Sequence, residues 1–173
     1  MQIPNITYYD FIRLDNEEQS NWINILRYGE PIEVDCTTWK YGDVKTVQQL
    51  LTKELTEDGF DYILKLVFKK GYMYIPFHIV LLTYRGIIDG IEKVTKIEND
   101  SLVSIPDAKV AAALEKVGGF EVFGRLPELL SLVEAGHGTY QQVYDLEWSL
   151  AYSIQLYLKR CNEFKLEISK HIS

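Results

Sequence analysis

The stretch LEWSLAYSIQLYLKRCNEFKLEI (residues 146–168) is typical of a long α-helix, because its apolar side chains recur at helical spacing. The steps between them are 4, 3, 4, 3 and 4 residues, which places them along one narrow seam that packs against one or two helices. The seam residues are Leu150, Ile154, Tyr157, Cys161, Phe164 and Ile168. The sequence therefore predicts a long C-terminal helix, and the question is what covers its seam.

The two halves of this helix differ in what surrounds the seam. Up to Leu158, additional apolar residues widen the apolar surface, so we expect Leu150 and Ile154 to lie in the protein's own core. Further on, the neighbours are charged, and we expect residues 160–173 to project and to bind another chain. The predicted partner-binding residues are Tyr157, Cys161, Phe164 and Ile168. The alternative is that the whole seam lies along the domain's own surface.

No segment of the sequence has the length and polarity of a membrane span, which needs about 20 consecutive apolar residues. The longest uncharged stretch, residues 71–84, is too short, and Glu147, Lys159 and Glu163 interrupt the C-terminal one. The N-terminus has neither the basic nor the apolar region of a signal peptide. We therefore expect no membrane contact.

The composition is that of a folded, acidic protein. Of the 173 residues, 47% are hydrophobic, which is enough to bury a core, and the length suggests a single domain spanning residues 1–173. The net charge of −7 disfavours nucleic acid as a partner, because phosphate binding needs a basic surface. Cys36 and Cys161 stand at no metal-binding or redox spacing, so we expect two reduced thiols.

Helix signals run through most of the chain. Cap residues, namely Asp15 or Asn16, Thr56 and Thr139, precede helical apolar patterns. About seven helices are predicted, at residues 15–29, 42–55, 57–71, 76–99, 108–119 and 126–136 and from 139 onward. The last helix is expected to bend near Asp145, and residues 32–38, which alternate apolar and polar side chains, are expected to form a short extended segment docked on the core. The predicted fold class is therefore an all-α domain.

Two glycines, Gly86 and Gly90, lie four residues apart on one face of the predicted 76–99 helix. Each costs about 1 kcal/mol relative to alanine inside a helix. A cost of this size indicates that another backbone packs closely there, so we expect a close helix–helix contact at both glycines.

No motif in the sequence carries recognisable chemistry. The histidines His78, His137 and His171 stand at no metal-ligand spacing from one another or from a cysteine. The acids of residues 57–61 lead a predicted helix, where the helix dipole favours negative charge. The GHG sequence at 136–138 is explained by the end of one helix and the start of the next. We therefore expect no enzymatic activity, no cofactor, no metal and no small-molecule substrate.

Tyrosine is unusually common, with 12 among 173 residues. Tyrosine and tryptophan are enriched at protein interfaces, because they combine apolar area with a polar group. Most of these tyrosines stand near the predicted helix ends and not in the middle of apolar runs. This pattern indicates a protein that binds other proteins.

Two stretches resemble a known class of proteins. VFGRLPELLSLVEAGHGTYQQVYDLEWSLAYSIQLYLKR (residues 122–160) is similar to the C-terminal halves of small, acidic, helical proteins of tailed bacteriophages, in which a short helix, a glycine turn and a long final helix follow one another. TTWKYGDVKTVQQLL (residues 37–51) is similar to their loop-to-helix entry. Such proteins are tail-assembly chaperones or virion neck and tail components. The resemblance implies an assembly role, in the cytoplasm of a bacterial host or in the virion, and carries over no functional residue.

The leading hypothesis is a non-enzymatic assembly protein that binds other protein subunits, either further copies of itself or phage structural proteins. One alternative is a small helical enzyme that uses His137 and the acids of residues 57–61. Another is an inhibitor or regulator whose acidic surface mimics nucleic acid. A deep polar pocket around His137 favours the enzyme, a large exposed apolar patch favours the assembly protein, and surface acids spaced like phosphates favour the regulator.

Overall fold

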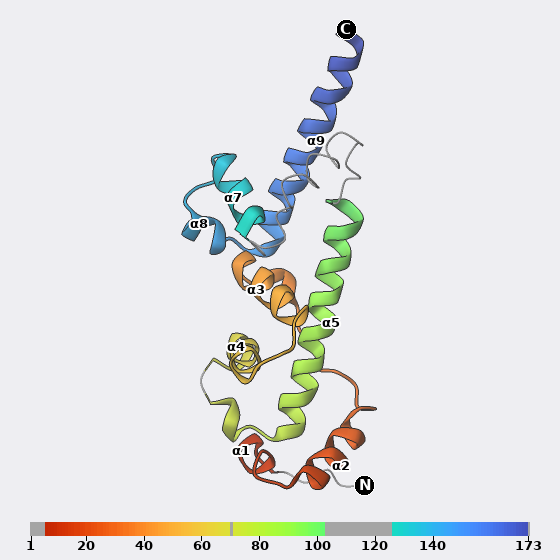
Figure 1. Cartoon of the computed structure of the whole chain (residues 1–173), viewed down its shortest axis with the longest axis vertical. Coiled ribbons are helices and arrows are strands. Elements are labelled where there is room, and N and C mark those ends of the chain that lie inside the picture. The colour runs from red at the N-terminus through yellow and green to blue at the C-terminus, as the bar shows by residue number, and fades with distance from the viewer. Residues whose placement is uncertain (1–5, 70, 103–125, 173) are drawn as a thin grey trace. The chain divides into compact units, whose positions relative to one another are not determined.

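The structure, a computed structural model, describes residues 6–69, 71–102 and 126–172. Within these residues the chain is helical and has no β-strand, which confirms the all-α prediction (Figure 1). The eight α-helices of this part are α1 (Tyr8–Phe11), α2 (Asn16–Leu26), α3 (Tyr41–Leu51), α4 (Glu57–Phe68), α5 (Phe77–Ser101), α7 (Leu126–Glu134), α8 (Tyr140–Tyr144) and α9 (Trp148–Ile172). Two short 3-10 helices join them, η1 (Cys36–Thr38) and η2 (Tyr72–Tyr74). The helix predicted at 108–119 lies outside the described residues.

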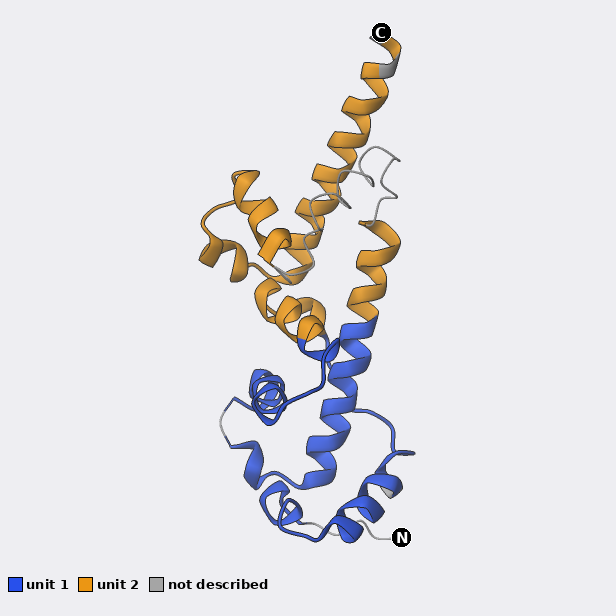
Figure 2. Ribbon diagram, viewed as in Figure 1, with its two compact units in different colours: residues 1–35, 50–92 blue, residues 36–49, 93–173 orange. Residues whose placement is uncertain are grey.

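The chain divides into two compact units (Figure 2). Unit 1 consists of residues 1–35 and 50–92, and unit 2 of residues 36–49 and 93–173. Helices α3 and α5 each contribute residues to both units, whereas α7, α8 and α9 belong to unit 2 alone. Among the described residues, no helix combines the length and the apolar character needed to cross a membrane.

Unit 1 is held together by aromatic side chains from distant parts of its sequence. Phe11 of α1 stacks on Phe77 of α5, with ring centroids 4.4 Å apart, and Leu26 of α2 joins this buried cluster. The Tyr8 N–H reinforces the contact by donating to the Ile75 carbonyl at 2.8 Å. A second buried cluster links α4, η2 and α5, and its members are Leu64, Tyr72 and Val80. Tyr8 packs against both clusters and thereby joins α1 to α4.

Unit 2 has its own core, built by α3, the end of α5, α7, α8 and the first turn of α9. Its buried apolar residues include Tyr41, Val44, Val47, Val94, Leu129, Leu132, Val143, Trp148 and Ala151. Because this core takes in only the first turn of α9, most of that 25-residue helix depends on other contacts for its burial.

Cap residues mark helix starts as the sequence predicts. Asp15 and Thr56 each accept the backbone N–H three residues further on, at 2.9 and 3.2 Å, and so cap α2 and α4. Thr139 forms a capping box with Gln142, but this box opens the short helix α8 and not the last helix. Each of these side chains satisfies an amide that has no partner inside its own helix.

The last helix is broken where the sequence predicted a bend. Two helices, α8 and α9, stand in place of one. The chain leaves the helix between them because its backbone pairs with the segment before α3. The Tyr41 N–H donates to the Leu146 carbonyl at 2.6 Å, and the Trp148 N–H donates to the Trp39 carbonyl at 2.8 Å. This pairing cannot be predicted from the local sequence, because it joins residues that lie far apart in the chain.

The segment predicted to be extended, residues 32–38, is a docked loop. Residues 31–35 have no regular secondary structure, and Cys36–Thr38 form η1 instead of continuing in an extended conformation. The Ile32 N–H donates to the Leu82 carbonyl of α5 at 3.1 Å, which holds the loop on unit 1. The segment is therefore a loop and not a strand, and of its apolar residues Cys36 is buried, Val34 is half-buried and Ile32 is exposed.

Candidate functional site

The apolar seam of α9 is exposed along its outer part. Tyr157 is 68% exposed and Phe164 is 66% exposed, which are large values for aromatic side chains. Ile168 is 41% exposed, and Cys161 between them is half-buried. The structure therefore leaves the four predicted partner-binding residues together on one accessible face of α9.

The prediction that Leu150 lies in the core is wrong, because its side chain is 51% exposed. Trp148 and Ala151 are buried in its place, and Ile154 is half-buried. At 100° per residue, the row that contains Trp148 and Ala151 lies roughly 120° around the helix from the seam. The helix thus uses one side to close its own unit and carries the seam on another side.

The end of α9 leaves the other described helices of unit 2. The Lys159 ammonium donates to the Ser101 carbonyl at the end of α5 at 2.9 Å. From residue 162 to residue 169, every side chain is exposed. In Figure 1 this end of α9 extends beyond α7 and α8 of the same unit. The outer seam is thus carried by the part of α9 in which every side chain from residue 162 to residue 169 is exposed.

The tyrosines fall into two groups that the sequence did not separate. Tyr28 and Tyr74 are among the most exposed large side chains, whereas Tyr41 and Tyr72 are buried although they stand at helix ends. Tyr41 receives a hydrogen bond from the Gln155 amide at 2.8 Å, and burial raises the pKa of its hydroxyl. Half of this small set is therefore part of the core and unavailable to a partner.

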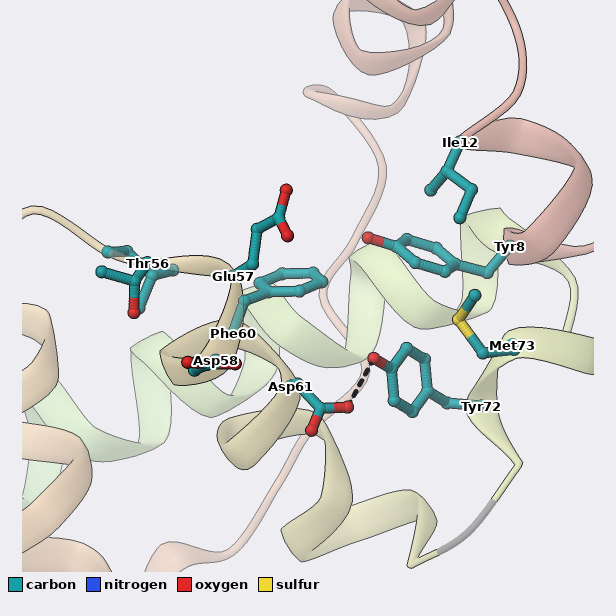
Figure 3. Close-up of a pocket in the computed structure, with 10 residues that line it drawn as sticks. Tyr8, Ile12, Thr56, Glu57, Asp58, Phe60, Asp61, Tyr72 and Met73 are labelled. Carbon is teal, nitrogen blue, oxygen red and sulfur yellow. Dashed lines mark hydrogen bonds between the residues drawn. The ribbon is translucent and has the colours of Figure 1, made fainter.

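A pocket of about 700 Å³ opens in unit 1, between α1, the start of α4 and η2. Three aromatic rings line it, and in Figure 3 the Tyr8 hydroxyl points toward Glu57 and Phe60 of α4. Tyr8 lies 6.1 Å from Phe60 and 5.6 Å from Tyr72 between ring centroids. Burial and the nearby Glu57 charge raise the pKa of the Tyr8 hydroxyl, because both disfavour a tyrosinate there.

One acid of this pocket, Asp61, holds two of the elements that line it together. The Tyr72 hydroxyl donates to Asp61 Oδ1 at 2.8 Å, and the Lys65 ammonium donates to the other Asp61 oxygen (Figure 3 shows the Tyr72 bond). These bonds, from Lys65 first and Tyr72 second, lower the pKa of the Asp61 carboxyl. A general acid needs a raised carboxyl pKa, so the lowered pKa of Asp61 suits its role in holding η2 on α4.

Replacing Tyr72 with phenylalanine tests this brace through its pH dependence. Burial first, and the bond to Asp61 second, raise the pKa of Tyr72 from 10.0 to about 12. On the alkaline side, the bond stabilises the fold fully below pH 10 and is lost as the pH rises through the pKa of Tyr72 at about 12. On the acid side, it is lost as the pH falls below 3.8 through the lowered pKa of Asp61. Because Asp61 is partly exposed, we expect Tyr72→Phe to lower the free energy of unfolding by about 1 kcal/mol at pH 7. Urea unfolding from pH 7 to 11.5 should show this difference shrinking above pH 10, and a difference that stays constant contradicts the assignment.

The predicted alternative site at His137 is a helix-ending turn. Gly136 has φ +86° and Gly138 has φ +116°, conformations that glycine adopts without strain. The His137 N–H donates to the Leu132 carbonyl at 3.0 Å, which closes the end of α7, and its side chain is exposed. Within the described part of the chain, no group of three or more histidine, cysteine or acidic side chains is placed to hold a metal ion.

Gly86 makes a close backbone contact, and its partner is a loop. A Cβ built on Gly86 lies 1.7 Å from the Ile32 carbonyl oxygen, far inside any tolerated contact. The predicted partner was a second helix, whereas the loop of residues 30–35 occupies that place. Gly90, which shares this face of α5, is half-buried.

A buried polar cluster in unit 2 has no counterpart among the sequence predictions. Glu98 of α5 accepts from the Lys45 ammonium at 2.9 Å, the Gln48 amide at 2.8 Å and the Trp148 indole at 2.8 Å. Lys45 also lies 2.5 Å from the half-exposed Glu128 of α7. The side chains of Lys45 and Glu98 are only 8% and 9% exposed.

One sequence signal points to Glu98. The apolar row Ile87, Ile91 and Val94 on α5 advances in steps of four and three residues, and the next step of four reaches Glu98. A carboxylate at a core position needs a buried partner. The sequence does not say which cation lies opposite, because Lys45 is 53 residues away. With every carboxylate oxygen of Glu98 engaged, the arrangement clamps α3, α5 and α9 together.

Comparison of the chain with protein-family models, with curated proteins and with solved structures finds no match.

Proposed function

We propose that this chain is a non-enzymatic assembly protein that binds other protein subunits through the exposed seam of α9. One observation carries the proposal: the predicted partner-binding residues lie in a single row on α9, in which Tyr157, Phe164 and Ile168 are exposed and Cys161 is half-buried. Contiguous apolar rows on a surface mark interaction sites more often than isolated apolar residues do.

The energetics of the row favour a partner. Burying Phe164 and Ile168 contributes roughly 3–6 kcal/mol before ordering costs, at about 1.5–3 kcal/mol for each side chain. The end of α9 on its own is a short helix in water, and such helices are only marginally stable. A partner on the seam therefore stabilises the helix and gains apolar contact at the same time.

The setting that we propose is the assembly of a tailed bacteriophage, in the cytoplasm of the bacterial host or in the virion. Its support is the resemblance of residues 122–160 and 37–51 to small helical proteins of that class. An exposed row at the end of a long helix suits either a tail-assembly chaperone or a neck or tail component, since both act by holding other subunits.

The enzyme alternative receives less support from the geometry. His137 is exposed on a turn of unit 2, and Asp61 in the pocket of unit 1 has a lowered pKa and two donors. The acidic regulator rests on the net charge of −7 alone. The seam of α9 is a more specific feature than either of these.

Phe164→Asp tests the proposal, with Asn162→Asp as the matched control. Both changes add one negative charge to exposed positions of α9, but only Phe164 lies on the seam. We expect Phe164→Asp to abolish binding of the subunits that the wild type retains, while circular dichroism and melting temperature stay within a few degrees of wild type. The measurement is mass by light scattering together with pull-down from the native source.

Two results count against the proposal. If Phe164→Asp unfolds the chain, the seam is covered within the protein itself. If Phe164→Asp and Asn162→Asp behave alike in both assays, the seam is not the binding surface.

A further inference from the structure

We infer that the outer seam of α9 binds the α9 seam of a second copy of this chain, in antiparallel orientation. In this pairing Cys161 faces Phe164 of the second copy, and Tyr157 faces Ile168. The inference rests on the proposed function and names the partner and its geometry. The apolar seam permits many pairings, and the charges beside it select this one.

The seam has the register of a coiled coil. Ile154, Cys161 and Ile168 occupy the positions called a in the seven-residue repeat, and Leu150, Tyr157 and Phe164 occupy those called d. Residues one before a and one after d flank the seam and contact the flanks of the partner helix. Between residues 160 and 167 of α9 these flanking residues are charged.

Three charges flank the seam on the projecting part of α9. Arg160 precedes Cys161 and Glu167 precedes Ile168, while Lys165 follows Phe164 on the opposite flank. When two such helices run antiparallel, flanks of the same kind face each other, so Arg160 and Glu167 lie on facing edges. With Cys161 opposite Phe164, Arg160 of each copy lies opposite Glu167 of the other, and two attractive pairs form.

In a parallel dimer, the charges beside the seam repel each other instead of attracting. In a parallel pair, the residue that precedes an a position of one helix faces the residue that follows the next d position of the other helix. Arg160 then faces Lys165 of the second copy, and symmetry makes this repulsion occur twice. The seam charges therefore disfavour the parallel dimer.

The neighbouring antiparallel registers are disfavoured for the same reason. If the second helix slides along the seam by seven residues in one direction, Arg160 lies opposite Arg160 of the second copy. A shift in the other direction places Glu167 opposite Glu167. Of the three registers, only the one with Cys161 opposite Phe164 joins opposite charges.

Two contacts that these charges make within α9 are exposed ion pairs. Arg160 forms an ion pair with Glu163 at 2.9 Å, and Glu167 lies 3.4 Å from the His171 ring within the same helix. Exposed pairs of this kind are worth little, so they exchange readily for pairs across an interface. The two helices overlap over only about two and a half seven-residue repeats, so the interface is small. We therefore expect a weak, concentration-dependent dimer.

Charge reversal in the full-length chain tests the pairing. We expect sedimentation equilibrium of the wild type to show a monomer–dimer equilibrium. Arg160→Glu and Glu167→Arg should each weaken the dimer about tenfold, because each converts two attractive pairs into two repulsive ones. The double variant Arg160→Glu/Glu167→Arg should restore wild-type association, and Asn162→Asp should leave it unchanged.

Each other outcome overturns the inference. A parallel dimer predicts that Arg160→Glu strengthens association, because a glutamate then faces Lys165. A double variant as weak as the single ones shows that Arg160 and Glu167 do not face each other. A wild type that stays monomeric rules out self-association. If Phe164→Asp still removes a different subunit in that case, the proposed function stands without this inference, and if it removes none, both fall.

Discussion

We expect Glu98→Ala to lower the free energy of unfolding by about 3–5 kcal/mol, the largest effect of any substitution considered for this protein. The carboxylate is 9% exposed and accepts hydrogen bonds from Lys45, Gln48 and Trp148. Removing it takes the acceptor from the buried Trp148 indole and leaves the buried Lys45 and Gln48 with one partner fewer. The cost is therefore dominated by the groups left behind and not by the net strength of the ion pair.

Two comparisons make this expectation specific. Glu92→Ala removes the same side chain from an exposed position of the same helix and should change stability by less than about 0.5 kcal/mol. Lys45→Met should cost less in the Glu98→Ala background than in the wild type, because the lysine has then lost one acidic partner and keeps Glu128. Urea unfolding of the four variants measures both. If Glu98→Ala is as mild as Glu92→Ala, the cluster does not hold the unit together.

The second large effect is expected at Gly86. Its missing side chain leaves room for the Ile32 carbonyl, whose oxygen lies 1.7 Å from the position of a Cβ. Gly86→Ala gains about 1 kcal/mol of helix propensity, but the loop or the helix has to move, at a cost of about 3 kcal/mol or more. We expect a net loss of at least about 2 kcal/mol, and a larger loss for Gly86→Leu.

Amide exchange separates this mechanism from a general loss of stability. The Ile32 N–H donates to the Leu82 carbonyl on the same stretch of α5, and a displaced loop breaks this bond. In Gly86→Ala the Ile32 amide should lose protection more than amides in α4 do. Asp89→Ala, an exposed substitution in the same helix, should keep that protection. A Gly86→Ala protein that melts like the wild type shows that the loop does not lie on the glycine.

The sequence predicted the parts of the fold that depend on local chemistry. Helix starts at Asp15 and Thr56 follow from side chains that reach amides three residues away, so no knowledge of the tertiary structure is needed. The seam of α9 follows from spacing alone, and its outer residues are exposed. The cost of glycine in a helix likewise pointed to a close contact at Gly86.

The failed prediction that Leu150 is buried shows where such reasoning stops working. Spacing shows that two residues share a face of a helix, but it does not show which face meets the core when both sides are apolar. In α9 the row with Trp148 and Ala151 is buried, and Leu150 is 51% exposed. The choice between the faces is made by residues of α3 and α5, which hold Trp148 through Glu98 and Gln155 through Tyr41.

Local sequence is enough to predict the all-α class, the capped helix starts and the seam of the last helix, because propensity, capping and periodicity act over a few residues. Tertiary contacts are needed to explain the break before α9, the loop that fills the space at Gly86 and the partner of Glu98. Each of these joins residues far apart in the chain, through the backbone pairing of Tyr41 with Leu146, the contact of Ile32 with α5, and the bond from Lys45. Such contacts form only when distant segments are packed together, so their energies are not encoded in any local stretch of sequence.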